Sequence, residues 1–210
     1  MGFASSLNVS PVSLEAPAQQ TLTLTLRNTG ERPITGQVRV YAWTLVDGED
    51  DLNETSVVNV SPPLVEIQPG ADYTLRVVRS AGEPPSGEEA YCVVVDGVPE
   101  AAARRSGVVQ LAMRWVVPAF FFDPVAGQAR LSWSVVRKNG EAFLSAQNDG
   151  DRAIKLVNVK LGGKPAGKEN SGWVLGHSQR LFALGKSVPA NLRVTAASGK
   201  EPISATAEAK

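Results

Sequence analysis

Apolar and polar residues alternate along the first part of the chain. From Gln20 to Leu26, leucine alternates with polar residues, so the leucines point to one face of an extended strand and the threonines to the other. Residues 37–43 alternate in the same way, and Asn28-Thr29-Gly30 between the two segments has the composition of a turn. The pattern therefore predicts consecutive antiparallel strands that are each buried on one face.

Further strand-like segments follow, with turn residues between them. Asp47-Gly48 and Pro69-Gly70 favour turns, and Ser61-Pro62-Pro63 stops a strand because proline has no N–H to donate. No segment of this half has the length and period of a stable helix. The regular recurrence of short strands is typical of a β-sandwich. The other expected strands of this half are 57–60, 73–79 and 90–95.

The strand pattern breaks at Asp123-Pro124 and then restarts in a weaker form. Asn139-Gly140 and Asn148-Asp149-Gly150 both favour hairpin turns. We therefore expect a first all-β domain over residues 1–124 and a smaller second β-domain over residues 125–210. The expected strands of the second domain are 131–135, 142–144, 154–159, 181–184 and 192–194.

The overall charge is balanced, which narrows the classes of partner. The 210 residues include 21 Lys and Arg and 21 Asp and Glu, so the formal net charge is zero. A neutral chain has no field that would gather nucleic acid, and we expect no nucleic acid as a partner. No apolar run approaches the roughly 18 residues of a membrane-spanning helix, so we expect no direct membrane insertion. The first six residues lack the segments of a signal peptide, which fits either a cytoplasmic protein or an exported one whose cleaved leader a start methionine has replaced.

Few residues of the chain can carry catalysis. The single cysteine, Cys92, excludes an internal disulfide framework, and the single histidine, His177, disfavours His-based catalysis and a multi-His metal centre. The acidic clusters at 49–51, at 88–89 and at 149 and 151 lie in loop-like sequence, where solvated surface charge is the ordinary outcome. Cys92 is expected to be buried as a small apolar residue, and His177 to lie in a turn. We therefore expect no enzyme, no catalytic residue, no metal and no cofactor.

One apolar segment is unusually long. Residues 108–122 are almost wholly apolar apart from Gln110, Arg114 and Pro118, and residues 99–106 before them are expected to form a connecting loop. Alternate residues of an extended strand share a face, so this segment presents a continuous apolar row. The candidate binding residues in that row are Val109, Leu111, Met113 and Trp115.

Arginine adds a candidate anchor for an anionic group. A guanidinium holds a carboxylate through two parallel hydrogen bonds, and a peptide whose C-terminal carboxylate is held in this way can pair its backbone with an exposed strand. The alternative interpretation is that the arginines are solvated or pair with surface acids. The candidate residues for this role are Arg76, Arg79 and Arg114.

Five stretches, taken in order, resemble the periplasmic pilus-assembly chaperones of chaperone–usher systems, most of all the archaic spore-coat-protein-U type. Together they cover residues 7–124. The fifth contains Arg114-Trp115-Val116-Val117-Pro118-Ala119-Phe120, which is similar to the family's basic-aromatic-aliphatic-Pro pattern. The other four are Val9-Ser10-Pro11-Val12 with the Thr-Leu repeat, Val60-Ser61-Pro62-Pro63 with Ile67-Gln68-Pro69-Gly70, Leu75-Arg76-Val77-Val78-Arg79, and Glu89-Ala90-Tyr91 through Asp96-Gly97-Val98-Pro99.

The resemblance implies two immunoglobulin-like β-sandwich domains in a boomerang arrangement with a subunit-binding cleft. It also implies a function in the periplasm: the first domain lends a strand, G1, to a pilin subunit that lacks its own final strand, and an outer-membrane usher receives the subunit. In this chain G1 corresponds to residues 108–117, and the apolar row named above would enter the open groove of the pilin. A free chaperone with such a strand exposed is expected to cap itself or to dimerise.

The chain departs from the family at two basic positions. The cleft arginine of the family's first strand is expected near Val12 or Ser13, where no arginine stands. The family's G1 lysine falls near Val117 or Pro118, where no basic residue stands either. Anchoring of a subunit carboxylate by that pair therefore does not carry over, and the three arginines named above are substitutes proposed on chemistry alone.

Two other classes of function stay open at this point. A structural or adhesive module of two fibronectin-like domains would bury residues 109–117 as an ordinary strand and would have no pilin client. A hydrolytic β-protein is disfavoured by the single histidine and the scattered acids. Strand donation has a physical basis of its own, because a pilin without its last strand exposes an apolar groove and unpaired backbone groups, and a donated strand covers both.

Overall fold

The computed structural model describes residues 7–83, 85–98 and 113–209. All regular structure among these residues is β-strand, which confirms the predicted all-β class. This described part of the chain contains no helix able to cross a membrane. The chain divides into two compact units, one made of Met1–Trp43 and Leu52–Pro124 and the other of Thr44–Asp51 and Val125–Lys210.

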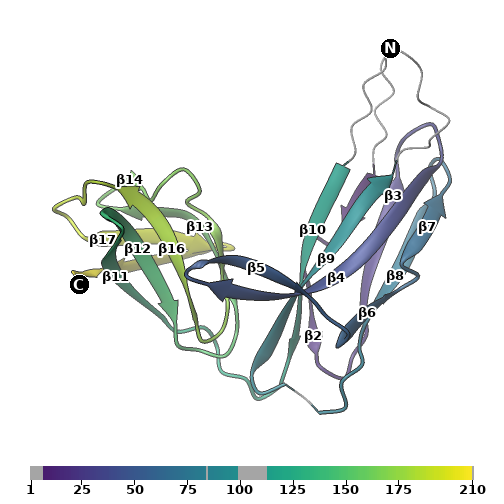
Figure 1. Ribbon diagram of the computed structural model, residues 1–210, viewed down its shortest axis with the longest axis horizontal. Helices are drawn as coiled ribbons and strands as arrows, with labels where there is room; N and C mark the ends of the chain where they lie inside the picture. Colours follow the sequence, from purple (N-terminus) through teal and green to yellow (C-terminus); the bar gives the residue numbers. More distant parts are fainter. Residues whose placement is uncertain (1–6, 84, 99–112, 210) are drawn as a thin grey trace. The chain divides into compact units, whose positions relative to one another are not determined.

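The N-terminal half forms a sandwich of two sheets (Figure 1). Its strands are β1 (Leu7–Ser10), β2 (Leu14–Pro17), β3 (Leu22–Asn28), β4 (Ile34–Val46), β5 (Glu49–Glu54), β6 (Val58–Ser61), β7 (Leu64–Ile67), β8 (Asp72–Arg79), β9 (Glu88–Val98) and β10 (Met113–Phe122). One sheet has the order β1-β3-β8-β6. The other has the order β2-β10-β9-β4-β5, and β7 also pairs with β4.

The core of this sandwich follows from the alternating pattern. On β3 the leucines Leu22, Leu24 and Leu26 are buried while Thr23 is exposed, as the period of a strand requires. They belong to one buried cluster with Tyr91, Val93 and Val95 of β9 in the opposite sheet. Burial of these apolar rows, at about 25 cal/mol per Å² of apolar surface, holds the two sheets face to face.

The turn after β3 crosses from one sheet to the other. β3 pairs with β1 and β8, whereas β4 pairs with β9, so the two alternating segments, predicted as consecutive antiparallel strands, are consecutive strands that do not pair with each other. The reason is the buried side chain of Asn28, which organises a crossing turn. Its oxygen accepts a hydrogen bond from the Gly30 N–H at 2.9 Å, and its amide donates to the carbonyls of Arg32 at 2.7 Å and Ile67 at 2.9 Å.

Asp47 and Gly48 form the predicted turn between β4 and β5. Both have positive φ, 54° and 87°, as a two-residue turn of the hairpin type requires. The expectation that residues 49–51 lie in a loop was wrong, because backbone pairing to β4 holds this acidic segment as a strand without an apolar row. Residues 88–89, expected in a loop as well, begin β9.

The C-terminal half forms a second sandwich. Its strands are β11 (Leu131–Lys138), β12 (Glu141–Asn148), β13 (Ile154–Leu161), β14 (Lys164–Pro165), β15 (Gly172–Val174), β16 (Ser178–Gly185), β17 (Arg193–Ser198), β18 (Glu201–Thr206) and β19 (Glu208–Ala209). One sheet has the order β16-β12-β11-β19 and the other β14-β13-β17-β18, with β15 paired to β13. Its core includes the buried side chains of Trp133, Leu144, Leu156 and Phe182. The segments predicted as strands after residue 125 lie on these elements, except that Leu192 precedes the start of β17.

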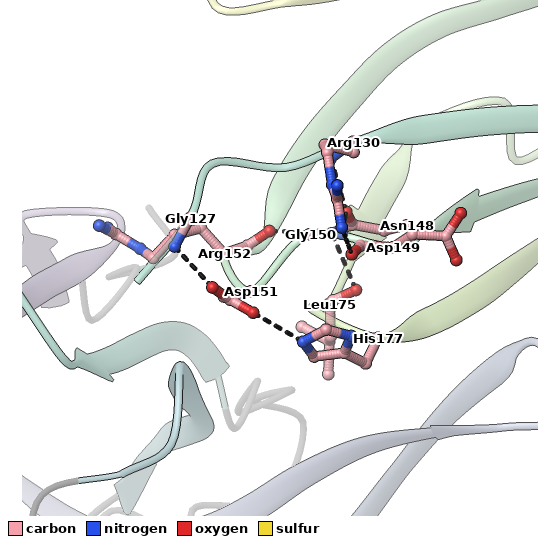
Figure 2. Close-up of polar contacts among 9 residues, drawn as sticks. All are labelled: Gly127, Arg130, Asn148, Asp149, Gly150, Asp151, Arg152, Leu175 and His177. Atoms are coloured by element: carbon pink, nitrogen blue, oxygen red, sulfur yellow. Dashed lines mark hydrogen bonds and ion pairs between the residues drawn. The ribbon is translucent and has the colours of Figure 1, made fainter. Parts of the chain in front are cut away.

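Two Asn-containing turns of this half differ in kind. Asn139-Gly140 joins β11 to β12 as a two-residue hairpin turn with φ of 53° and 80°, as predicted. The hairpin predicted at Asn148-Asp149-Gly150 was wrong, because β12 and β13 belong to different sheets. The Asn148 side chain is fully buried and accepts from the backbone N–H groups of Arg130 at 2.9 Å and Gly150 at 3.0 Å (Figure 2). It also donates to the carbonyls of Arg152 and Leu175 at 2.8 and 3.0 Å.

Asp151 joins two loops of the second unit beside this turn. One carboxylate oxygen accepts a hydrogen bond from the Gly127 N–H at 2.6 Å, and the other lies 2.8 Å from Nε2 of His177 (Figure 2). The Gly127 N–H, and after it the His177 ring, hold the pKa of Asp151 below its usual range. His177 lies in a turn, as predicted, with φ of 51°. The Asp–His pair thus braces two loops of this unit.

Candidate functional site

β10 has a partner along its full length on one side only. It pairs antiparallel with β9 from Met113 to Phe122 and parallel with β2 from Ala119 to Phe122. Among the residues that the structure describes, Met113–Pro118 therefore have an unpaired edge facing away from β9. The backbone N–H and C=O groups of such an edge can pair with a strand of another chain.

The inner row of β10 runs from the core to the surface. Phe121 and Ala119 are fully buried, and Val117 is 4% exposed. Trp115 is partly buried and packs against the same core, and Met113 is 44% exposed. Since every second residue of a strand shares a face, Met113 and Trp115 continue the row that fills the core of their own unit. At the unpaired edge this row is open to an apolar partner.

The outer row of β10 carries a charged cluster. Arg114 lies directly opposite Asp96 of β9 and donates two hydrogen bonds to its carboxylate, from Nε at 2.6 Å and from Nη2 at 3.1 Å. Arg39 donates a further hydrogen bond to the same carboxylate. It stands on β4, the strand that flanks β9 on the side opposite to β10. Hydrogen bonding from Arg114 first, and then from Arg39, holds the pKa of Asp96 below its usual range. We call these three residues the Arg39–Asp96–Arg114 cluster.

The other two candidate arginines lie elsewhere. Arg76 and Arg79 stand on β8, which belongs to the opposite sheet from β10, so the structure does not bring the three arginines together. Arg76 is exposed. The side chain of Arg79 is only 5% exposed and donates to Glu89 from Nε at 2.8 Å and Nη2 at 3.0 Å. The Tyr91 hydroxyl donates to the same carboxylate at 2.8 Å, so this Arg79–Glu89–Tyr91 group joins the two sheets.

Two of the predicted binding residues are beyond what the structure covers. Val109 and Leu111 lie outside the described residues, as does the connecting loop expected at 99–106.

Cys92, expected as a small buried residue, is a buried free thiol. Among the described residues no group of three or more His, Cys, Asp or Glu side chains could hold a metal ion.

Comparison with known families decides the class of the protein. The family described as pili and flagellar-assembly chaperone, PapD N-terminal domain, matches residues 6–126, which is more than half of the chain. The chain belongs to this family. The protein is therefore a pilus-assembly chaperone and not an enzyme. No curated protein sequence matches the chaperone.

Solved structures show the same two-sandwich fold over the whole chaperone. A chain of the CsuC–CsuE chaperone–tip adhesion subunit complex from the archaic Csu pili of Acinetobacter baumannii is 22% identical, with a TM-score of 0.78, over 98% of this chain and 100% of that one. The Escherichia coli chaperone DraB is 24% identical with a TM-score of 0.72, over 100% and 99%. A chain of the Salmonella enterica SafA pilin complex with the SafB chaperone is 19% identical with a TM-score of 0.74, over 96% of each.

Part of this candidate site was predicted from the sequence and part was not. The prediction included Met113, Trp115 and Arg114, whose role in binding stays a prediction; Arg114 pairs with an acid of its own chain, as the alternative interpretation expected. The prediction missed Arg39 and Asp96, because only the pairing of β4, β9 and β10 places these side chains beside Arg114. The one signal that was present is an acid next to a glycine, Asp96-Gly97, at the end of an apolar strand.

Proposed function

We propose that this chaperone works in the periplasm, where it binds a pilin subunit by donating residues 108–117, which include the N-terminal half of β10, and then passes the subunit to an outer-membrane usher. The carrying observation is the unpaired edge of Met113–Pro118 together with the exposed end of its inner apolar row. The donated side chains in this proposal are Val109, Leu111, Met113 and Trp115.

The energetics of the proposal rest on two terms. An incoming strand pairs with backbone groups that would otherwise face water at the edge of β10. Each large apolar side chain that enters the groove of the guest contributes about 1.5–3 kcal/mol before entropy is subtracted. Such a complex is stable, and a strand that fits the groove better can still displace the chaperone.

The comparisons support the choice of guest. The CsuC–CsuE and SafA–SafB structures are complexes of a chaperone with a subunit or pilin, and both share the fold of this chain. In the absence of a subunit, we propose that the open edge of β10 is covered by a second copy of the chaperone, since an exposed apolar edge favours association.

A single charge in the apolar row tests the proposal. A pilin subunit is co-expressed with the chaperone, and the complex is quantified by affinity capture and gel filtration. Met113→Asp is expected to abolish the 1:1 complex, because the carboxylate would have to enter an apolar groove. Leu111→Asp should have the same effect.

The matched control is Val78→Asp on β8. Val78 is 37% exposed, close to the 44% of Met113, but lies on the opposite sheet, away from the edge of β10. This variant should keep the complex. A Met113→Asp protein that folds, as shown by its thermal unfolding, and still captures the subunit as well as Val78→Asp does would rule out donation through this row.

A further inference from the structure

We infer that the Arg39–Asp96–Arg114 cluster selects guests that carry an acidic side chain on the strand paired with β10, at the position beside Arg114. This inference rests on the proposed strand donation and adds a charge requirement to it. The occupant is an extended peptide segment with Asp or Glu on the face opposite to its apolar residues.

The cluster holds more positive than negative charge. One carboxylate, that of Asp96, serves two guanidinium groups, so the three side chains together carry an excess of one positive charge. Asp96 is enclosed, with 18% of its side chain exposed, whereas the side chains of Arg39 and Arg114 are 44% and 62% exposed. The arginines therefore face solvent while the acid that pairs with them lies beneath.

Arg114 keeps hydrogen-bonding capacity for a second carboxylate. A guanidinium has five N–H donors, and the bonds to Asp96 come from Nε and Nη2. Within the described part of the chain, Nη1 of Arg114 makes no hydrogen bond. Asp96 already orients the guanidinium of Arg114. Binding of a guest carboxylate therefore costs less side-chain entropy than binding to a freely rotating arginine would.

The position of the cluster defines the position of the guest acid. Arg114 stands on the half of β10 that has an open edge, and a residue directly beside it on an added strand has its Cβ about 4.5–5.5 Å away on the same face. That face is opposite to the one that carries Met113 and Trp115. A guest strand therefore presents apolar residues to the inner row and, one residue out of phase, an acid to Arg114.

Charge reversal tests the inference. The affinity of the co-expressed subunit for Arg114→Glu is expected to fall about tenfold or more, because like charges then stand side by side on adjacent strands. The matched control is Arg27→Glu. Arg27 forms an exposed cross-strand pair with Asp72 on the opposite sheet, at 3.2 Å, so the same charge change occurs away from β10. Its affinity should stay within about twofold of the unaltered protein.

Two further sets of variants test the role of Asp96 and identify the carboxylate of the subunit that contacts Arg114. Asp96→Asn should lower the affinity much less than Arg114→Glu does, because the positive charge of Arg114 stays and the amide oxygen can still accept a hydrogen bond from it. A loss as large as that of Arg114→Glu would mean that the cluster only braces β10 and would overturn the inference. In the subunit, each Asp and Glu is changed to Lys in turn, and one of these changes should restore binding to Arg114→Glu. If blocking the subunit's C-terminal carboxylate restores binding to Arg114→Glu instead, Arg114 contacts the end of the subunit chain and the proposed side-chain contact is wrong.

Failure of this inference can be separated from failure of strand donation. If Arg114→Glu binds like Arg27→Glu while Met113→Asp abolishes the complex, strand donation stands and the charge requirement falls. If Met113→Asp has no effect, the proposed function itself falls. Raising the salt concentration should weaken the unaltered complex more than the Arg114→Gln complex, since exposed charge pairs are screened over about 8–10 Å.

Discussion

At the scale of single residues, one amide group closes a sheet-crossing turn in each unit. Asn28 and Asn148 both end a strand, both are fully buried, and each accepts a hydrogen bond from the glycine N–H two residues on and donates to the carbonyl four residues on. The two halves of the chain thus use the same local device although their sequences show no convincing repeat.

Removal of one of these amides should be costly. Asn148→Ala leaves buried N–H and C=O groups without partners, and each such group costs about 1–3 kcal/mol. We expect the free energy of unfolding of the second unit to fall by about 2–4 kcal/mol, measured by chemical denaturation. Gln147→Ala is the control, because the hydrogen bond of Gln147 to Asp149 is exposed at 3.3 Å, and its effect should stay below about 0.5 kcal/mol. Equal effects of the two changes would contradict the role of Asn148.

The Arg79–Glu89–Tyr91 group predicts a dependence of stability on pH. Hydrogen bonding from Arg79 holds the pKa of Glu89 below its usual range, so its contribution to stability is present above the unfolded-state pKa and is lost as the pH falls through the folded-state pKa. Burial raises the pKa of the Tyr91 hydroxyl, which stays a donor in this range. Acidification from pH 6 to below pH 4 should therefore weaken the first unit.

Glu89→Gln tests this prediction. At neutral pH it should destabilise the first unit by about 1–3 kcal/mol, because the nearly buried Arg79 loses its counter-charge. Its free energy of unfolding should also fall less steeply on acidification than that of the unaltered protein. Glu66→Gln is the control, since Glu66 makes an exposed hydrogen bond to Gln68. An unchanged acid slope in Glu89→Gln would show that other carboxylates govern the transition.

At the scale of elements, the sequence predicts a strand where apolar residues recur at every second position. It does not predict a strand that is held only by backbone pairing to its neighbour. β3, with buried leucines at period two, is recognisable from its sequence. β5 is not, because Glu49–Glu54 are mostly exposed and polar, and only the tight turn at Asp47-Gly48 sets them against β4. Alternation reports burial, so it says nothing of a strand that lies in solvent on both faces.

The same limit applies to turns and to the site. Asn139-Gly140 and Asn148-Asp149-Gly150 look alike in sequence, yet the first closes a hairpin and the second crosses between sheets, because only the second has its asparagine buried under the sandwich. The apolar row of β10 is visible as a pattern. The partners of Arg114 are not, because Asp96 and Arg39 meet it only through the register of three strands.

At the scale of the whole molecule, the two units have separate cores. Binding of a subunit to one unit can therefore be detected as a change in the stability of that unit alone. The buried clusters around Leu24 and around Leu144 share no residue. The division into domains at 1–124 and 125–210 stays a prediction.

A bound subunit should stabilise only the unit that holds β10. A ligand present at 100 times its dissociation constant stabilises the native state by about 2.7 kcal/mol. For a unit of about 120 residues that corresponds to a rise in Tm of about 10 °C, which scanning calorimetry should find in one of two transitions. The Met113→Asp protein should show no rise. A shift of both transitions in the unaltered protein would indicate that the subunit engages the second unit as well.

The inner row of β10 continues into the core of its own unit, and this restricts how the length of the segment can change. Phe121, Ala119 and Val117 hold the strand in one phase, so Trp115 and Met113 inherit that phase. Insertion or deletion of a single residue between Arg114 and Val117 would turn every side chain upstream of it to the opposite face, so that Arg114 would be presented to the guest's groove. Lineages of this protein can therefore change the length of the segment by even steps while keeping its chemistry, and lose it with an odd one.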